Sequence, residues 1–298
     1  MVRPARFGFN PETAGTNAFQ RRGDAPQEEV RARALREFDA FVEVLRDAGV
    51  RVLVFSDTPE PEKPDAVFPN NWVSLHHDGT AVLYPMQAAS RRAEVRRDLV
   101  EGLPRRGFKL ERILDLTAHA ERGRFLEGTG SLVFDHVHRV AYGCLSPRTD
   151  ADLAEQVCRQ LQYDPVLFRA TDAAGRPLYH TNVMLAVGAK WAVACLDAIP
   201  DEGQKEGVRG RLETGDRFVV EITHAQMERF AGNVLQVGER YVVASKRARA
   251  AFTPDQAAAL EMHGTWLTTP LDAIETEGGG SARCMLTEVF LPVPGAAL

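Results

Sequence analysis

The apolar positions of this chain recur in one arrangement: an apolar run, a short polar turn and a second apolar run. In the first instance the turn is His77-Asp78-Gly79, and an Asp-Gly step between apolar runs is a strong hairpin signal. The arrangement predicts four hairpins. Their strands are expected at residues 72–75 and 80–84, 131–134 and 139–142, 183–187 and 191–195, and 234–237 and 241–244.

A helix-like stretch and one more short strand follow each predicted hairpin. The helices are expected at residues 89–103, 150–161, 201–213 and 254–262, and the closing strands at residues 113–116, 166–169, 218–222 and 265–268. The last helix has a clear start, because Thr253 can cap it and Pro254 suits its first turn. The chain therefore predicts a strand–strand–helix–strand unit repeated four times.

A fifth copy of the unit is divided between the two ends of the chain. A strand-like run begins at Cys284 and continues to residue 291, and the missing parts are residues 7–9, an amphipathic helix at 26–48 and a strand at 51–55. Dividing one unit in this way closes the edges of a circular array.

The spacing of the repeats supports a circular array. The residues at the start of each first strand are Asn71, Glu127, His180, Asn233 and Cys284, which are 56, 53, 53 and 51 residues apart. We therefore predict an α/β fold over residues 1–298 as a single domain, a five-bladed propeller with pseudo-fivefold symmetry whose last blade is closed by the N-terminus. The alternative is an ordinary α/β sandwich whose hairpins happen to recur.

Composition excludes several classes of function. The 298 residues carry a net charge of −5, which argues against a nucleic-acid or anionic-membrane partner. No apolar run reaches the length of a transmembrane helix, and the N-terminus lacks a signal core. The four cysteines form no CxxC pair, so we expect free thiols in a cytoplasmic protein. The sequence leaves open whether two copies form a homodimer.

The three glycines at 278–280 lead directly to Cys284. Ordering three glycines costs backbone entropy, so they are expected where the chain turns sharply or leaves room beside a ligand. A thiol beside such a loop can serve as a nucleophile. The alternative is a buried, inert core cysteine.

Glu127 and His180 start first strands in two other copies and complete a reactive trio with Cys284. A thiolate attacks, a histidine carries protons near neutral pH, and a carboxylate orients the imidazole. We expect the three side chains to converge on one pocket. The neighbouring pairs His76-His77 and His136-x-His138 are expected to face solvent and to hold no metal, because suitably spaced further ligands are missing.

Four short motifs carry a family resemblance. They are Pro-Asp-Ala-Val-Phe-Pro-Asn-Asn at 64–71, Leu-Glu-Gly-Thr-Gly at 126–130, His-Thr-Asn at 180–182 and the C-terminal Cys284. In this order they resemble the guanidino-group modifying enzymes, the superfamily of amidinotransferases, arginine deiminases and dimethylarginine dimethylaminohydrolases, with the pentein fold. The resemblance covers essentially the whole chain and is strongest to citrulline-utilisation hydrolases, which also fits Phe-Gly-Phe-Asn-Pro at 7–11.

The resemblance implies roles for particular residues. Cys284 would be the nucleophile, His180 the general acid and base, and Glu127 its partner, with no cofactor. Arg148 and Arg91 would hold the substrate carboxylate through bidentate hydrogen bonds; the alternative for Arg91 is a solvated helix start. Asp65 would bind the α-amino group or the nitrogens of the substrate.

The chain departs from arginine-acting relatives at two positions. Asn71 and Asn182 stand where those relatives place carboxylates. Burying a guanidinium without a carboxylate partner is costly, whereas an amide suits a neutral ureido group. The expected reaction is hydrolysis of an amino-acid substrate, citrulline, to ornithine, ammonia and carbon dioxide through a covalent cysteine intermediate. The alternatives are an arginine or substituted-arginine hydrolase and a non-catalytic pentein that only binds.

Overall fold

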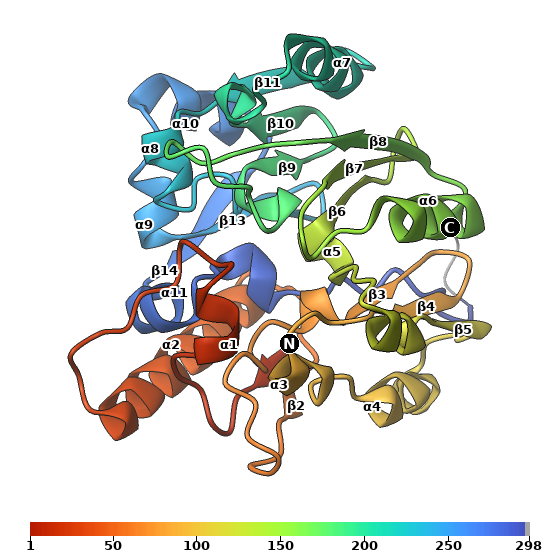
Figure 1. Ribbon diagram of the computed structural model, residues 1–298, viewed down its shortest axis with the longest axis vertical. Coiled ribbons are helices and arrows are strands. Elements are labelled where there is room, and N and C mark those ends of the chain that lie inside the picture. Colours follow the sequence, from red (N-terminus) through yellow and green to blue (C-terminus); the bar gives the residue numbers. More distant parts are fainter. Residues whose placement is uncertain (296–298) are drawn as a thin grey trace.

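Residues 1–295 are described by the computed structural model, which contains four three-stranded sheets of identical strand order (Figure 1). In each sheet the middle strand runs antiparallel to the strand before it and parallel to the strand after it. The sheets are β3 (Val73–Leu75), β4 (Thr80–Leu83) and β5 (Arg112–Asp115); β6 (Leu132–Asp135), β7 (Val140–Cys144) and β8 (Asp164–Phe168); β9 (Leu185–Val187), β10 (Trp191–Ala194) and β11 (Phe218–Glu221); and β12 (Leu235–Val237), β13 (Tyr241–Ser245) and β14 (Thr265–Thr269). The four hairpins and four closing strands predicted from the sequence are confirmed within one to two residues at most ends.

The fifth unit differs from the other four. Its sheet has two short parallel strands, β1 (Val2–Arg3) and β2 (Phe55–Ser56). The predicted strand at 51–55 is therefore shorter than expected, and residues 7–9 form no strand. The predicted strand from Cys284 is also wrong. Cys284 lies in a 3₁₀ turn, η6 (Ala282–Met285), and Val289 makes only an isolated parallel bridge to Leu75.

Helices connect the strands and cover the sheets. They are α1 (Pro11–Ala14), α2 (Gln27–Asp47), α3 (Ala89–Arg92), α4 (Arg97–Glu101), α5 (Gly128–Ser131), α6 (Ala151–Leu161), α7 (Glu202–Leu212), α8 (His224–Met227), α9 (Lys246–Arg249), α10 (Pro254–Glu261) and α11 (Asp272–Gly278). Among residues 1–295, no helix combines the length and the apolar character needed to cross a membrane.

Local sequence explains where several helices begin. The Asp150 side chain accepts a hydrogen bond from the backbone N–H of Leu153 at the start of α6. Thr253 and Gln256 form a reciprocal capping box at the start of α10, with Pro254 in the first turn. The single helix expected at 89–103 is instead broken into α3 and α4, because Arg91 and Glu94 turn into the protein and pair there.

The long helix α2 ties the N-terminal part of the chain to the C-terminal part. Its apolar stripe, which includes Phe38, Phe41 and Leu45, packs in one core cluster with Val243 of β13 and with Cys284. The helix also contacts β14. Burial of this stripe therefore fixes the segment that carries Cys284 against the last three-stranded sheet.

Candidate active site

A single helical turn precedes several of the first strands, and these turns contact one another. They are η1 (Pro69–Asn71), α5, η4 (Thr181–Val183) and η6; α5 contacts both η1 and η4, and η1 contacts η6. Glycine makes the close approach possible. A Cβ on Gly128 would lie 2.2 Å from the backbone oxygen of Asn70, and one on Gly130 would lie 2.5 Å from Asn71 Nδ2 and 2.7 Å from His180 Nδ1.

The five residues that sequence spacing treated as equivalent do not occupy one position, and Asn233 lies in none of these turns. Glu127 and His180 are the N-cap residues of their turns, whereas Asn71 and Cys284 lie within theirs. The assumption of one equivalent position is therefore wrong by up to a turn of helix. Because of this offset, Asn182, which lies inside the turn that His180 caps, contacts Cys284 Sγ.

Glu127 and His180 form a buried hydrogen-bonded pair. His180 Nε2 lies 2.8 Å from Glu127 Oε2, and the backbone N–H of Gln87 donates to Glu127 Oε1 at 3.0 Å. Burial alone would raise the pKa of Glu127, but the charge of Arg148 and the contact with His180 outweigh it and hold the pKa below its ordinary value. Glu127 is thus an ionised carboxylate, which can only accept hydrogen bonds.

The ionised partner decides which nitrogen of His180 carries the proton. Because Glu127 accepts, His180 Nε2 is the donor, and in the neutral imidazole Nδ1 keeps its lone pair. Burial lowers the pKa of His180 to about 4, although Glu127 partly opposes this. At neutral pH the imidazole is therefore an uncharged base that can accept a proton at Nδ1.

Cys284 is 3% exposed, and two amides donate to its sulfur. Asn182 Nδ2 lies 3.4 Å from Cys284 Sγ and Asn233 Nδ2 lies 3.2 Å from it. Sequence reasoning included Asn233 among the repeat positions but assigned it no role; its place at the start of a first strand was the only signal. In the described part of the chain all four cysteines are free thiols.

Most of the predicted site residues line one small cavity. It is lined by Cys284, His180, Asp65, Asn71, Arg91 and Arg148, with about 10 Å³ of free space, roughly the room of one water. All six of these side chains are at most 3% exposed. Glu127 and Asn182 are not part of the lining; Glu127 is hydrogen-bonded to His180, which lines it, and Asn182 to Cys284, which also lines it.

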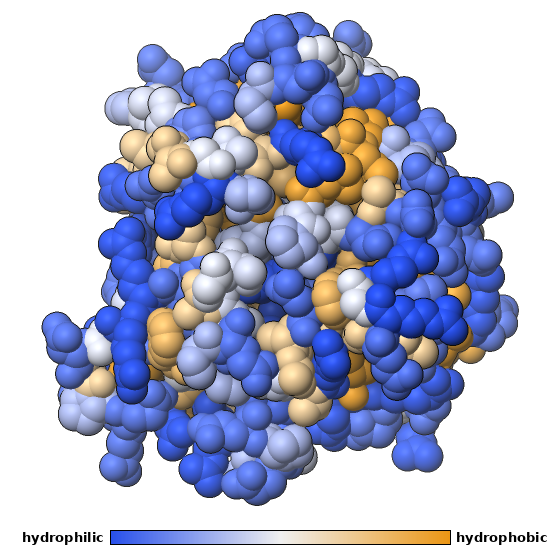
Figure 2. Space-filling view, in the orientation of Figure 1, coloured by the Kyte–Doolittle hydropathy of each residue, from blue (hydrophilic) through white to orange (hydrophobic). Residues whose placement is uncertain are grey.

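The N-terminal segment at 13–17 closes this cavity. Thr13 and Asn17 belong to its lining, and Asn17 Nδ2 donates to the backbone oxygens of Gly278 and Gly279. Figure 1 shows α1 beside α11 near the centre of the view, and Figure 2 shows the mostly hydrophilic side chains of that face. The free space is too small for an amino acid, so part of the lining must move before one can enter.

Arg91 is buried and fully engaged within the protein, so the solvated-helix alternative is wrong. Its Nε and Nη2 donate to the two carboxylate oxygens of Glu94 at 3.0 and 2.9 Å. Its Nη1 donates to Asn71 Oδ1 at 2.9 Å. This arrangement fixes the Asn71 amide, because a guanidinium has only donors and the amide oxygen must face it.

Arg148 joins the Glu127–His180 pair to the N-terminal segment at 13–17, the covering segment of the cavity. Its Nη1 lies 3.4 Å from Glu127 Oε2, and its Nη2 donates to the backbone oxygen of Thr13 at 3.1 Å and to Thr16 Oγ1 at 2.5 Å. The guanidinium also stacks 5.0 Å from the ring of Tyr179. Displacing the segment at 13–17 frees the Nη2 edge for another acceptor.

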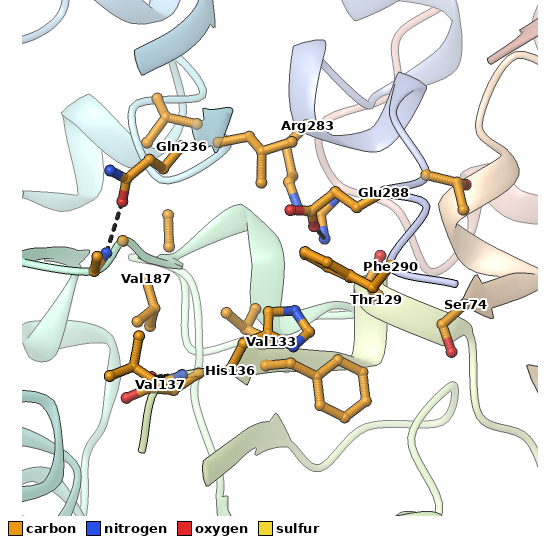
Figure 3. Close-up of a pocket in the computed structure, with 18 of the residues that line it drawn as sticks. Ser74, Thr129, Val133, His136, Val137, Val187, Gln236, Arg283, Glu288 and Phe290 are labelled. Atoms are coloured by element: carbon orange, nitrogen blue, oxygen red, sulfur yellow. Dashed lines mark hydrogen bonds and ion pairs between the residues drawn. The ribbon is translucent and has the colours of Figure 1, made fainter. Parts of the chain in front are cut away.

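A second cavity, of about 200 Å³, receives the side chain next to the cysteine (Figure 3). Arg283 lies there beside Glu288, with Nη2 3.4 Å from Glu288 Oε2, so the side chains of Arg283 and Cys284, neighbours in the chain, lie in different cavities.

His76 also lines this second cavity and is only 5% exposed, so the prediction that it faces solvent is wrong. Its Nε2 is hydrogen-bonded to Ser74 Oγ at 2.7 Å. His136 and His138 are half-buried, and His77 is exposed. Residues 1–295 contain no cluster of side chains suited to a metal ion.

Comparison with known proteins gives one family and one fold. The model of the family described as "N,N dimethylarginine dimethylhydrolase, eukaryotic" matches residues 3–291. No curated protein matches the chain in sequence.

Several solved structures are similar in fold. ArgZ, an arginine dihydrolase from the ornithine-ammonia cycle in cyanobacteria, superposes with a TM-score of 0.73 at 19% identity over 99% of this chain and 41% of ArgZ. The chain thus spans about two fifths of that protein, but it covers 98% of the separate N-terminal domain of ArgZ, again at 19% identity and a TM-score of 0.73. A dimethylarginine dimethylaminohydrolase matches with a TM-score of 0.64 at 19% identity over 95% of this chain and 96% of the other.

Proposed function

The chain belongs to the family described as N,N dimethylarginine dimethylhydrolase, eukaryotic, and within that family we propose that it hydrolyses the ureido group of citrulline to give ornithine, ammonia and carbon dioxide. As a member of this family it is a hydrolase of C–N bonds other than peptide bonds. The choice of a ureido substrate rests on one observation, the orientation of two buried asparagine amides.

Asn71 presents a donor to the cavity. Arg91 occupies its oxygen, and Asn71 Nδ2 is buried without a hydrogen-bond partner among residues 1–295. Asn182 is not part of the cavity lining but contacts Cys284, and it offers an acceptor, because its Nδ2 faces Cys284 Sγ while its buried Oδ1 lacks a partner within the described residues. An unpaired buried donor or acceptor costs about 1–3 kcal/mol, so each favours a substrate that completes it.

A ureido group meets both requirements, since its oxygen accepts and its N–H groups donate. A guanidinium carries donors only and leaves the Asn71 N–H opposed by another donor. Arginine or a substituted arginine is the second candidate, favoured by one observation. Asp65 lines the cavity, and its Oδ1 is buried with no partner in the described part of the chain, so it offers an acceptor to a cation.

The proposed mechanism uses Cys284 and His180, which line the cavity, and Glu127, which is hydrogen-bonded to His180. Cys284 Sγ attacks the ureido carbon as its proton passes to His180 Nδ1, and Glu127 holds the imidazolium that forms. His180 then returns that proton to the departing nitrogen, which leaves a thiocarbamate on Cys284. A water that gives a proton to His180 attacks the thiocarbamate, the thiolate leaves, and the carbamate product loses carbon dioxide. The same final products arise whichever nitrogen leaves first.

Arg148 is the proposed anchor for the substrate carboxylate. Its Nη2 contacts to the segment at 13–17 are ones that a carboxylate can replace when the segment opens. Arg91 is better suited to orienting Asn71, because Glu94 already takes the other edge of its guanidinium. Asp65 remains the proposed partner of the substrate α-amino group.

The propeller prediction is part of the same proposal. Four sheets of identical order, and a fifth unit built from β1, β2, α2 and the C-terminal segment, support five α/β blades in one domain spanning residues 1–298. Of that range, 296–298 lie outside the described residues. The cytoplasmic location and the absence of membrane, nucleic-acid and cofactor partners stay predictions.

The test is a comparison of kcat/KM for citrulline, arginine and N-methylated arginines with one enzyme preparation. We expect citrulline to be preferred, and Cys284→Ser to abolish turnover while the protein stays folded. Faster turnover of arginine than of citrulline would select the second candidate. Failure of every substrate, with an intact fold, would favour a binding protein.

A further inference from the structure

Asn233 is a fully buried amide whose hydrogen-bonding groups all face the protein. Its Nδ2 donates to Cys284 Sγ at 3.2 Å and to the backbone oxygen of Asn182 at 2.9 Å. Its Oδ1 accepts from the backbone N–H of Arg283 at 3.1 Å. Asn233 therefore links the turn that holds Asn182 to the turn that holds Cys284.

These partners leave the amide one orientation. The Arg283 N–H is a donor and the Asn182 carbonyl is an acceptor, so the amide oxygen must face the first and the amide nitrogen the second. The remaining N–H then faces the sulfur. Neither Asn182 nor Asn233 is part of the cavity lining, but they differ in one respect. Asn182 has an unpaired oxygen within the described residues, whereas both amide hydrogens and the oxygen of Asn233 are already used.

We propose that Asn233 is a second amide donor to the nucleophile, forming with Asn182 a two-donor cradle that stabilises the thiolate of Cys284. This inference rests on the proposed function only in taking Cys284 as the nucleophile. The cradle acts twice in the cycle, when the thiolate forms to attack and when it leaves in the last step. A hydrogen bond to an ionised group is stronger than one to a neutral group, so the donors favour the thiolate over the thiol.

The charged groups near Cys284 do not replace these donors. His180 is held neutral by burial, Arg91 and Arg148 pair with Glu94 and Glu127, and the Arg283 side chain turns into the second cavity. Asp65 and Tyr179, which also line the cavity, provide no positive charge. The two amides are therefore the groups in direct contact with the sulfur that stabilise its negatively charged thiolate form.

The experiment measures the pH midpoint of Cys284 alkylation by iodoacetamide, without any substrate. Burial raises the pKa of Cys144 and Cys158 to about 12 and that of Cys195 to about 11, so these thiols stay unreactive, and Cys284→Ser gives the background. How often the covering segment opens affects the rate of alkylation at every pH. The pH midpoint, in contrast, reports formation of the Cys284 thiolate.

Two replacements separate a chemical role from a structural one. Asn233→Ala removes the donor and should raise the midpoint by about one to two pH units. Asn233→Asp keeps the shape and the acceptor for Arg283 but places an acceptor or negative charge at the sulfur, so its midpoint should rise further. A purely structural role gives the opposite order, with Asp the milder change. If Asn233→Ala does not fold, the proposal is decided by comparing the alkylation midpoint of Asn233→Asp with that of wild type.

Asn70→Ala is the matched control, because Asn70 is also a buried asparagine, within the turn η1, but donates to Thr129 Oγ1 and not to the sulfur. Its midpoint should equal that of wild type. An unchanged midpoint in Asn233→Asp, or an equal shift in Asn70→Ala, overturns the cradle. In turnover assays the Asn233 variants should lose kcat with little change in KM. The alkylation result stands whichever substrate is turned over, so it can fail separately from the proposed function.

Discussion

Adding one methyl group at Gly130 tests whether the spacing between Asn71 and His180 is needed for catalysis. Gly130 has an ordinary negative φ, so alanine is tolerated by the backbone and the effect comes from its Cβ alone. That Cβ would lie 2.5 Å from Asn71 Nδ2 and 2.7 Å from His180 Nδ1, where ordinary contacts begin at 3.4 Å.

The size of the effect follows from these distances. To restore ordinary contact with the added Cβ, Asn71 Nδ2 must retreat by about 0.9 Å and His180 Nδ1 by about 0.7 Å. Misplacing a reacting group by about 1 Å can cost roughly 100-fold in rate, so we expect kcat/KM for citrulline to fall by about 10- to 100-fold.

The assay is steady-state turnover of citrulline together with thermal unfolding of the same samples. Gly210→Ala is the control, because Gly210 lies within α7 with nothing within 4 Å of its added Cβ, and alanine there should keep activity and slightly raise stability. A folded Gly130→Ala enzyme with wild-type kcat/KM would refute the reasoning that base and amide must stay at their observed separation.

Three further predictions concern specificity, binding and pH. Asn71→Asp should lower the preference for citrulline over arginine at least 10-fold from an expected wild-type value of about 150-fold, measured as the ratio of kcat/KM; an unchanged ratio contradicts the amide argument. Arg148→Ala should reduce kcat/KM by roughly 10- to 150-fold, while Arg159→Ala, an exposed arginine of α6, should not; equal activity in both would place the carboxylate anchor elsewhere. Burial lowers the pKa of His76 to about 4, so between pH 6.5 and 4 the unfolded chain binds more protons and the free energy of unfolding falls as pH falls. His76→Gln should flatten that dependence in urea unfolding at pH 5 and 7, and an unaltered slope would mean that His76 does not titrate on unfolding.

The sequence was sufficient for features that depend on neighbours along the chain. Alternation of apolar residues around Asp78-Gly79 predicts a hairpin because side-chain direction and turn geometry are local, and Thr253 with Pro254 predicts a helix start for the same reason. The candidate trio could also be predicted, since a repeat brings Glu127, His180 and Cys284 to one end of three of its units. Cys284 and His180 do line one cavity, and Glu127 is hydrogen-bonded to His180.

Only the tertiary structure decided what each of those side chains touches. In the sequence Arg91 resembles a free basic residue. In the structure its guanidinium donates hydrogen bonds to Glu94 and Asn71, because α3 turns inward. His76 reads as a turn residue, yet it is buried beside Ser74. Cys284 reads as the start of a strand, yet it lies in a 3₁₀ turn where two asparagines from other units reach its sulfur. Those asparagines stand 51 and 102 residues from the cysteine, and contacts at such separation follow from the packing of whole units against one another, which no local pattern of residues contains.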